Sequence, residues 1–215
     1  MADNYLEKRY DEVFGSGAGK KTVVKRIGQS LDRLLLKNRS QRAYDKSVVV
    51  TREQLARIIS VNTKLPSARN QQVLRFRPVV QGDEADAVLQ HIRLGAALPE
   101  LHLPPVGQEP EAFIVICSTV PESRYVDIDL GISVQSMLLK AVEMGLGGIC
   151  ICAFDREAVI AALQLPCEPL AIVAIGKGTE RVRLVPIREG DSQTYYRVAD
   201  GMHCVPKLQL DDLLL

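Results

Sequence analysis

DIDLGISVQSMLLKAVEM, residues 127–144, is the most extensive apolar pattern in this chain. Its length and periodicity predict one long helix whose apolar side chains occupy more than one side. One face carries Ile128, Ile132, Leu139 and Val142, and another carries Leu130, Val134, Met137, Leu138 and Ala141. A helix that is apolar around most of its circumference needs cover on most sides, which a chain of 215 residues seldom supplies alone. We therefore predict that a second copy of the chain covers part of this helix.

Short apolar runs before and after this helix predict buried strands. They are AFIVIC at 112–117, GGICICA at 147–153 and LAIVAI at 170–175. Continuous apolar runs of this length indicate strands that are covered on both faces. Partial alternation predicts a further strand over 73–80, and helical spacing predicts helices over 51–61, 83–94 and 155–163, with a proline-rich loop over 95–111. This order predicts an α+β or α/β fold with one central sheet covered by helices.

Composition excludes several classes of protein. Hydrophobic residues make up 47% and charged residues 25% of the chain, which is the mixture of an ordinary globular protein. The 27 Lys and Arg residues nearly balance the 26 Asp and Glu residues, which argues against a dedicated binder of nucleic acid or of a membrane surface. We find no apolar stretch of membrane-spanning length and no signal peptide. Five cysteines, an odd number, favour reduced thiols and a cytoplasmic protein.

Residues 1–36 are rich in Lys and Arg, and we predict a basic helical arm there, followed by one domain over 37–215. Within the arm, GSGAGKKT at 15–22 invites comparison with a phosphate-binding loop. The glycine spacing and the extra Lys21 depart from that pattern, and the preceding residues are a poor buried strand. The pattern favours a flexible linker instead.

Three short segments could carry chemistry, although each also has an ordinary structural explanation. Arg39, Ser40 and Arg42 place two guanidinium groups around a hydroxyl, which suits a phosphate or an exposed basic helix end. The segment PSARNQQ at 66–72 offers small and amide groups to a planar heterocycle, or serves as a polar connection. The segment GLGG at 145–148 permits close backbone approach to a ligand, or ends a helix. No Cys or His spacing predicts a metal site.

In this order and spacing, the segments resemble the FMN-dependent nitroreductase family, from about residue 38 to about residue 207. The Arg-Ser-x-Arg pattern followed by an aromatic residue stands at 39–44, and the Pro-Ser-x-x-Asn-x-Gln pattern stands at 66–72. A long apolar helix then precedes Gly-Leu-Gly at 145–147, and Val-Pro-Lys at 205–207 is similar to the basic tail of the family. Asn38, Val73 and Leu74 depart from the family pattern.

The resemblance implies an α+β, nitroreductase-like fold. It has a central mixed sheet covered by helices, a long buried helix at a homodimer interface, and an FMN-binding domain over 37–215. Arg39 and Ser40 would hold the FMN phosphate with Lys207 as a further cation, and Arg42 would lie near N1 and O2 of the isoalloxazine. The remaining implied cofactor contacts are Pro66, Ser67 and Asn70, which would come from the partner subunit, and the backbone of Gly147 and Gly148 at the ring edge.

The resemblance also implies an activity, that of an NAD(P)H oxidoreductase. Hydride would pass from NAD(P)H to FMN and then, in a ping-pong cycle, to a nitroaromatic, a quinone or a related small acceptor. No side chain is needed as a covalent catalyst, and no metal is implied. Two alternatives stay open. One is another flavin reaction on the same scaffold, such as reductive dehalogenation or flavin breakdown. The other is a flavin-binding or sensor protein without efficient turnover, which Asn38, Val73 and Leu74 keep in consideration.

Overall fold

The computed structural model describes residues 29–95 and 102–215. Most of the predicted basic arm, residues 1–28, and part of the predicted loop, residues 96–101, therefore lie outside the described residues. The first described helix, α2 (Leu31–Lys37), begins after Ser30, whose side chain accepts a hydrogen bond from the N–H of Arg33. The predicted boundary between residues 36 and 37 falls at the last turn of this helix, and the division into arm and domain stays a prediction.

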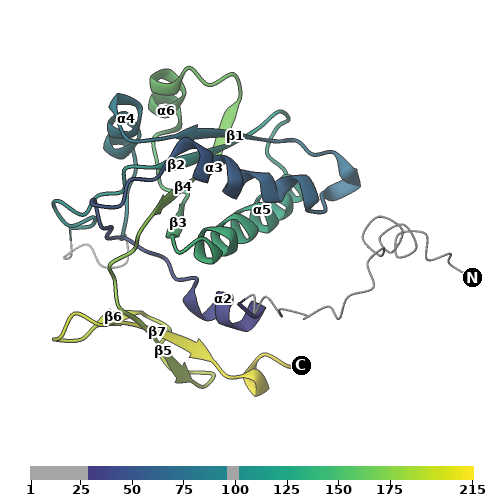
Figure 1. Cartoon of the computed structure of the whole chain (residues 1–215). Helices are drawn as coiled ribbons and strands as arrows, with labels where there is room; N and C mark the ends of the chain where they lie inside the picture. The colour runs from purple at the N-terminus through teal and green to yellow at the C-terminus, as the bar shows by residue number, and fades with distance from the viewer. Residues whose placement is uncertain (1–28, 96–101) are drawn as a thin grey trace, which may run out of the picture.

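A four-stranded sheet forms the centre of the fold (Figure 1), with the strand order β1-β2-β4-β3. Its strands are β1 (Leu74–Val79), β2 (Phe113–Ser118), β3 (Gly147–Ile151) and β4 (Glu168–Gly176). Every pair in this sheet is antiparallel, which corrects the expectation of a mixed central sheet. Helices cover both faces of the sheet, so its inner strands are apolar throughout, as in parallel sheets, and the sequence pattern alone does not distinguish the two.

Helices on the two faces make a three-layer fold (Figure 1). One face is covered by α3 (Arg52–Ile59), which continues into the 3-10 helix η1 (Ser60–Lys64), and by α5 (Arg124–Glu143). The other face is covered by α4 (Asp83–His91) and α6 (Arg156–Leu163). Each helix and strand predicted between residues 51 and 175 is present with small shifts of its ends, and α5 begins three residues before the predicted start.

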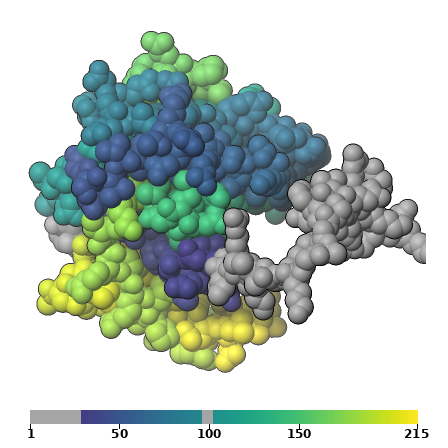
Figure 2. Space-filling view, in the orientation of Figure 1, coloured from purple at the N-terminus to yellow at the C-terminus, as the bar shows by residue number. Residues whose placement is uncertain are grey.

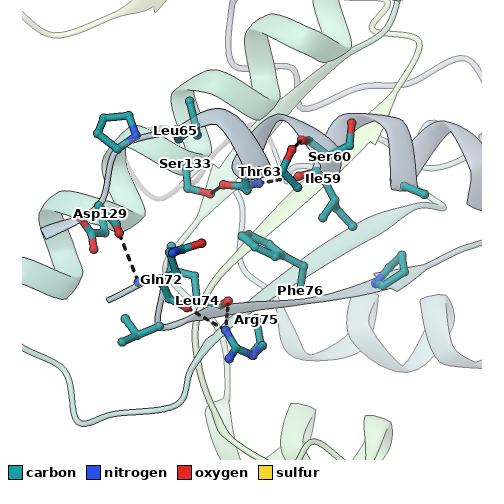
Figure 3. A pocket seen from close by; sticks show the side chains of 16 residues that line it. Ile59, Ser60, Thr63, Leu65, Gln72, Leu74, Arg75, Phe76, Asp129 and Ser133 are labelled. Carbon is teal, nitrogen blue, oxygen red and sulfur yellow. Dashed lines mark hydrogen bonds between the residues drawn. The ribbon is translucent and has the colours of Figure 1, made fainter. Parts of the chain in front are cut away.

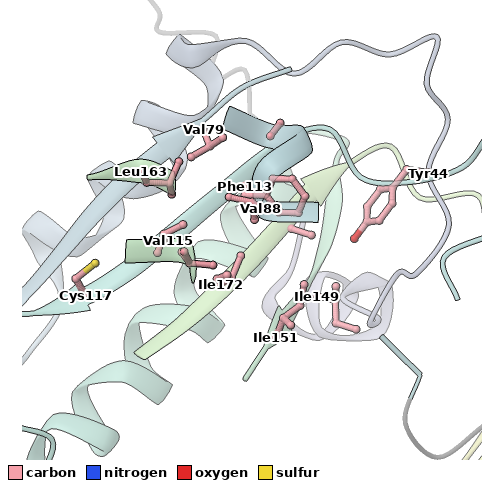
Figure 4. Close-up of a cluster of buried hydrophobic side chains, with 13 residues drawn as sticks. Tyr44, Val79, Val88, Phe113, Val115, Cys117, Ile149, Ile151, Leu163 and Ile172 are labelled. Carbon is pink, nitrogen blue, oxygen red and sulfur yellow. The ribbon is translucent and has the colours of Figure 1, made fainter. Parts of the chain in front are cut away.

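The hydrophobic core lies on both sides of β2 and β4. Phe113 and Val115 of β2 point toward α4 and α6 with Ile172 of β4 (Figure 4). Ile114 and Ile116 point the other way, toward α3 and α5. This alternation is the ordinary consequence of the two-residue period of a strand.

The long helix α5 is only partly covered by its own chain. Met137, Leu138 and Ala141 are buried in the core against the sheet. Tyr125 and Ile128, near the start of the helix, are 58% and 49% exposed. The predicted excess of apolar surface is thus present, but it is confined to one side and to the first turns.

A backbone segment, residues 39–45, runs along the free edge of β3, and we call it the strap. Ser40 pairs with Gly148 in a parallel bridge, and the N–H of Gln41 donates to the Gly148 carbonyl at 3.1 Å. At its far end, the N–H of Asp45 donates to the Lys177 carbonyl at 2.8 Å. The strap therefore satisfies backbone groups at an edge of the sheet that has no further strand among the described residues.

Glycines provide the space that the strap needs. A Cβ on Gly176 would lie 2.6 Å from the Tyr44 ring, and one on Gly178 would lie 2.4 Å from the Gln41 side chain. A Cβ on Gly148 would lie 2.3 Å from the Ala174 carbonyl oxygen. Only glycine fits at these positions without moving the backbone or the strap.

A second, three-stranded sheet follows the central one, in a region where the sequence predicts only a basic tail. It consists of β5 (Val182–Ile187), β6 (Tyr196–Arg197) and β7 (His203–Leu208), in the order β5-β7-β6. Here β5 pairs parallel with β7 and β6 pairs antiparallel, so the mixed pairing expected for the central sheet occurs in this one. Figure 2 shows α2, in purple, between α5 and this sheet.

Among the described helices, none has the length and hydropathy to cross a membrane.

Replacing Gly148 with Ala should lower the free energy of unfolding by about 2 kcal/mol, because the new methyl group would meet a backbone carbonyl that cannot rotate away. Gly147→Ala is the matched control, since its methyl group would meet only the flexible Gln41 side chain at 3.3 Å. Urea unfolding followed by circular dichroism measures both changes. Equal losses in the two variants would contradict the assigned contact.

Candidate functional site

A cavity of about 360 Å³ lies between the strap, α5 and the second sheet, and we call it the cation cavity. It brings together Arg39, Ser40, Arg42 and Lys207, the four residues that the sequence analysis assigned to the phosphate and to the nearby ring. Its remaining lining residues are Asn38, Gln135, Leu138, Val182, Tyr195, His203 and Val205. The volume lies within the range of small-molecule sites in proteins.

Local contacts hold the arginines of the strap at this cavity. The Arg39 guanidinium donates to the Leu35 carbonyl at 2.7 Å, which fastens it to the last turn of α2. The Arg42 guanidinium donates to the Ser40 carbonyl at 3.3 Å and lies over the Tyr195 ring, 5.4 Å from its centroid. Both cations are therefore positioned by backbone and aromatic groups, and no described carboxylate pairs with either of them.

Three buried nitrogen atoms in the cation cavity have no hydrogen-bond partner among the described residues. They are Nε of Arg39, Nε of Arg42 and Nδ1 of His203. A buried donor without an acceptor costs about 1–3 kcal/mol, more when it is charged, so an acceptor that bound beside these atoms would be favoured. Burial also lowers the pKa of Arg39, although a guanidinium stays charged in proteins. The chemistry of this donor set suits an anion.

One carboxylate, that of Glu180, adjoins the cavity and already has partners. Its side chain is 4% exposed and pairs with the Arg197 guanidinium, and it also accepts the backbone N–H of Arg42. The N–H of Glu180 in turn donates to the Gln41 side chain at 3.3 Å. Glu180 therefore links the strap to β6 without neutralising the guanidinium of Arg42.

Sequence reasoning missed His203 and Tyr195 as residues of this cavity. His203 is 3% exposed, and its ring meets the Tyr195 ring edge-on at 5.1 Å. Burial, and then the nearby Arg42 charge, lower the pKa of His203, so its neutral form is favoured. A signal existed in the sequence, because residues 203, 205 and 207 share one face of a strand and Lys207 was already a candidate.

The predicted residues of the 66–72 segment lie at a different cavity, which we call the loop cavity. It has a volume of about 480 Å³ and lies between α3, β1 and α5 (Figure 3). Pro66 and Ser67 line it, whereas Asn70 lies beside it in the 3-10 turn η2 (Ala68–Asn70). The other lining residues are Ala56, Ile59, Ser60, Asn62, Thr63, Leu65, Gln72, Val73, Leu74, Arg75, Phe76, Pro78, Asp129 and Ser133.

The 66–72 segment has an unusual and well-fixed backbone. Arg69, Asn70 and Gln72 have φ of 53°, 54° and 50°, in the left-handed region that residues other than glycine rarely adopt. The buried Asp129 carboxylate accepts the N–H of Ala68 at 2.8 Å and holds the turn to α5 (Figure 3). Strained backbone that is held by such contacts is concentrated at functional sites.

The two cavities are separate within one chain. Ser133 lines the loop cavity and Gln135 lines the cation cavity, and residues two apart on a helix point to nearly opposite sides, so the two cavities adjoin opposite sides of α5. Gly147 and Gly148, the other predicted residues, lie next to the strap, and Gly148 packs against Ala174. The structure thus gives Gly148 a packing role, and its contact with a ligand stays a prediction. The described residues contain no metal-binding cluster of His, Cys, Asp and Glu.

Comparisons with known proteins identify the fold. The model of the Nitroreductase family matches residues 35–177. Among solved structures, a nitroreductase family protein from Clostridium novyi NT is 18% identical, with a TM-score of 0.57 over 82% of this chain and 94% of that one. An FMN-dependent nitroreductase from Clostridium difficile R20291 is 22% identical, with a TM-score of 0.56 over 69% and 87%. No curated protein matches the chain. The second sheet lies beyond the family match.

Glu180→Gln should lower the free energy of unfolding by about 2 kcal/mol, because the Arg197 guanidinium and the Arg42 N–H lose a buried carboxylate. Glu168→Gln is the matched control, since Glu168 is 52% exposed and 3.5 Å from Arg156, and its loss should be about 0.5 kcal/mol or less. Thermal and urea unfolding measure both. An unchanged stability in Glu180→Gln would show that this pair does not hold the strap.

Proposed function

Because the chain belongs to the nitroreductase family, we propose that it is an FMN-dependent NAD(P)H oxidoreductase that reduces a nitroaromatic, a quinone or a related small acceptor. The observation that supports this most directly is the cation cavity, where buried donors on Arg39 and Arg42 lack partners. FMN carries a phosphate group, whose oxygens are the acceptors that such donors favour. The residues present therefore fit the cofactor.

The four predicted cofactor-binding residues at the cation cavity have distinct proposed roles. Arg39 and Ser40 bind the phosphate, and Lys207 adds a third group from β7 at the same cavity. Arg42 lies toward the isoalloxazine, near N1 and O2, where a fixed cation stabilises the charge of reduced flavin. Stacking on Tyr195 supports this role, since it fixes the guanidinium without neutralising it. When bound, FMN supplies reversible two-electron chemistry that accepts hydride from NAD(P)H and passes electrons to the acceptor.

We further propose that the protein is a homodimer with shared sites. Pro66, Ser67 and Asn70 lie away from the cation cavity of their own chain, so they serve a flavin on the partner subunit. Tyr125 and Ile128 on α5 leave apolar surface exposed next to this segment, and Arg69 lies over the Tyr125 ring at 5.9 Å. A second copy that covers this surface would place the fixed turn at the shared site.

Asn38 supports a second candidate, a flavin-binding protein without efficient turnover. Its amide donates to the Gln135 side chain at 3.4 Å. This position therefore holds a neutral link to α5, where the family pattern has a positively charged residue. Anaerobic NAD(P)H consumption by the purified protein, with and without a nitroaromatic or quinone, separates the two. Turnover that requires the acceptor supports the oxidoreductase, whereas bound FMN without turnover supports the second candidate.

The purified protein should be yellow with non-covalent FMN, and Arg39→Ala should lose most of the cofactor. Arg42→Ala should keep more FMN but have a lower flavin reduction potential, because a cation near the reduced ring is gone. Flavin released by heat and identified by mass gives the content, and anaerobic titration gives the potential. A colourless protein that does not take up added FMN would refute the proposal, and an unchanged potential in Arg42→Ala would refute that role.

Ile128→Glu should produce a monomer that has lost its flavin, because a charge in a buried subunit interface is strongly disfavoured. Val106→Glu is the control, since Val106 is 97% exposed on the loop before β2 and should leave both properties unchanged. Size-exclusion chromatography with light scattering and flavin absorbance measures them together. A folded Ile128→Glu monomer with one FMN per chain would contradict the shared site.

A further inference from the structure

His203 is the one residue of the cation cavity whose charge can change near neutral pH. Its ring is almost completely buried, and its Nδ1 has no partner among residues 29–95 and 102–215. Its backbone is fixed, since its N–H donates to the Arg181 carbonyl at 2.9 Å. A buried, unpartnered ring nitrogen in a cavity lined by cations needs an explanation beyond packing.

The groups around His203 come from four segments of the chain. The strap contributes Arg39 and Arg42, and β7 contributes Lys207. The segment after β4 contributes Glu180, and the region of β6 contributes Tyr195 and Arg197. Because Glu180 is already paired with Arg197, the charge that His203 faces is mainly positive.

This environment opposes a proton on His203 in the free protein. Burial lowers its pKa from the ordinary 6.5, and the charges of Arg42 and Arg197 lower it further, with Glu180 acting in the opposite direction. A phosphate dianion in the same cavity would offset two of the three positive charges of Arg39, Arg42 and Lys207 and would bring anionic oxygens to the cavity that His203 lines. An opposite charge at 4–6 Å favours the protonated form of a histidine.

We propose that His203 is a proton-linked ligand of the phosphate group that binds in the cation cavity. It is neutral in the free protein at neutral pH, takes up one proton from water as the phosphate binds, and then donates a hydrogen bond to the phosphate. This inference rests on the proposed function, since FMN is the phosphate ligand concerned. It predicts that cofactor retention depends on pH through a residue that touches no redox-active atom.

The sign of the pH dependence follows from linkage. The pKa of His203 is raised in the complex, so the added affinity is complete below the free-protein pKa and is lost as pH rises through the pKa of the complex. The second pKa of a phosphate monoester is about 6, so above about pH 7 the ligand itself is already a dianion. Between about pH 7 and pH 8.5 the dissociation constant for FMN should therefore rise by about tenfold, and by about twofold or less in His203→Gln.

Calorimetry on the full chain, stripped of flavin, tests the inference with FMN and with riboflavin. Titrations in buffers of different ionisation enthalpy give the number of protons taken up. The wild-type protein should take up more protons than His203→Gln with FMN, and the two should be equal with riboflavin, which has no phosphate. His91→Gln, on α4, is the matched control and should behave as the wild type. Equal uptake in His203→Gln and wild type with FMN, or a His203 effect that persists with riboflavin, would overturn the inference.

A second measurement needs no variant and separates this inference from the proposed cofactor. The His203 pKa is measured by NMR on histidine-labelled protein, with and without inorganic phosphate. A pKa that rises with phosphate supports the proton-linked site even if the protein binds no FMN, in which case only the proposed function fails. A His203 pKa that phosphate leaves unchanged overturns the inference, whatever the flavin result.

Discussion

The fit of the strap against glycines at the edge of the central sheet determines where the functional residues stand. Gly176 and Gly178 leave room for the Tyr44 ring and the Gln41 side chain, and Gly148 leaves room for the Ala174 carbonyl oxygen. Tyr44 is buried, and its hydroxyl donates to the Gln41 carbonyl at 2.8 Å. Because the strap is short and fixed at both ends, the arginines that it carries have little freedom. Their position is a property of the sheet as much as of their own segment.

The same geometry explains why the two groups of residues to which we assign cofactor contacts lie apart. The strap follows the β3 edge, near the later turns of α5, whereas the 66–72 turn is tied by Asp129 to the first turns of that helix. A single helix, α5, therefore sets the spacing between the two halves of the proposed site. In the proposed dimer, α5 acts as the common support, and each subunit contributes cations to one flavin and a strained turn to the other.

Much of the fold could be predicted because its signals are local. Apolar runs identify β2 and β4, and helical spacing identifies α3, α4 and α6. The direction of the strands could not be predicted, because helices on both faces give antiparallel strands the pattern of parallel ones. In the cation cavity, Arg39, Ser40 and Lys207 were found through short motifs. Tyr195 and His203 of this cavity, and Glu180 beside it, were missed because they reach the strap through contacts that cross more than 130 residues, as between Arg42 and Glu180.

The second sheet also sets an order of events during synthesis. The strap is synthesised first, and the residues that face it across the cation cavity, Tyr195, His203 and Lys207, are added about 150 or more residues later. At a synthesis rate of about 5–20 residues per second, these residues follow the arginines of the strap by roughly ten to thirty seconds. Chains that stop before β7 would carry a nearly complete three-layer core and half of an anion site. For the proposed FMN site, the core would therefore fold before the cofactor binds, because β7 completes the cavity.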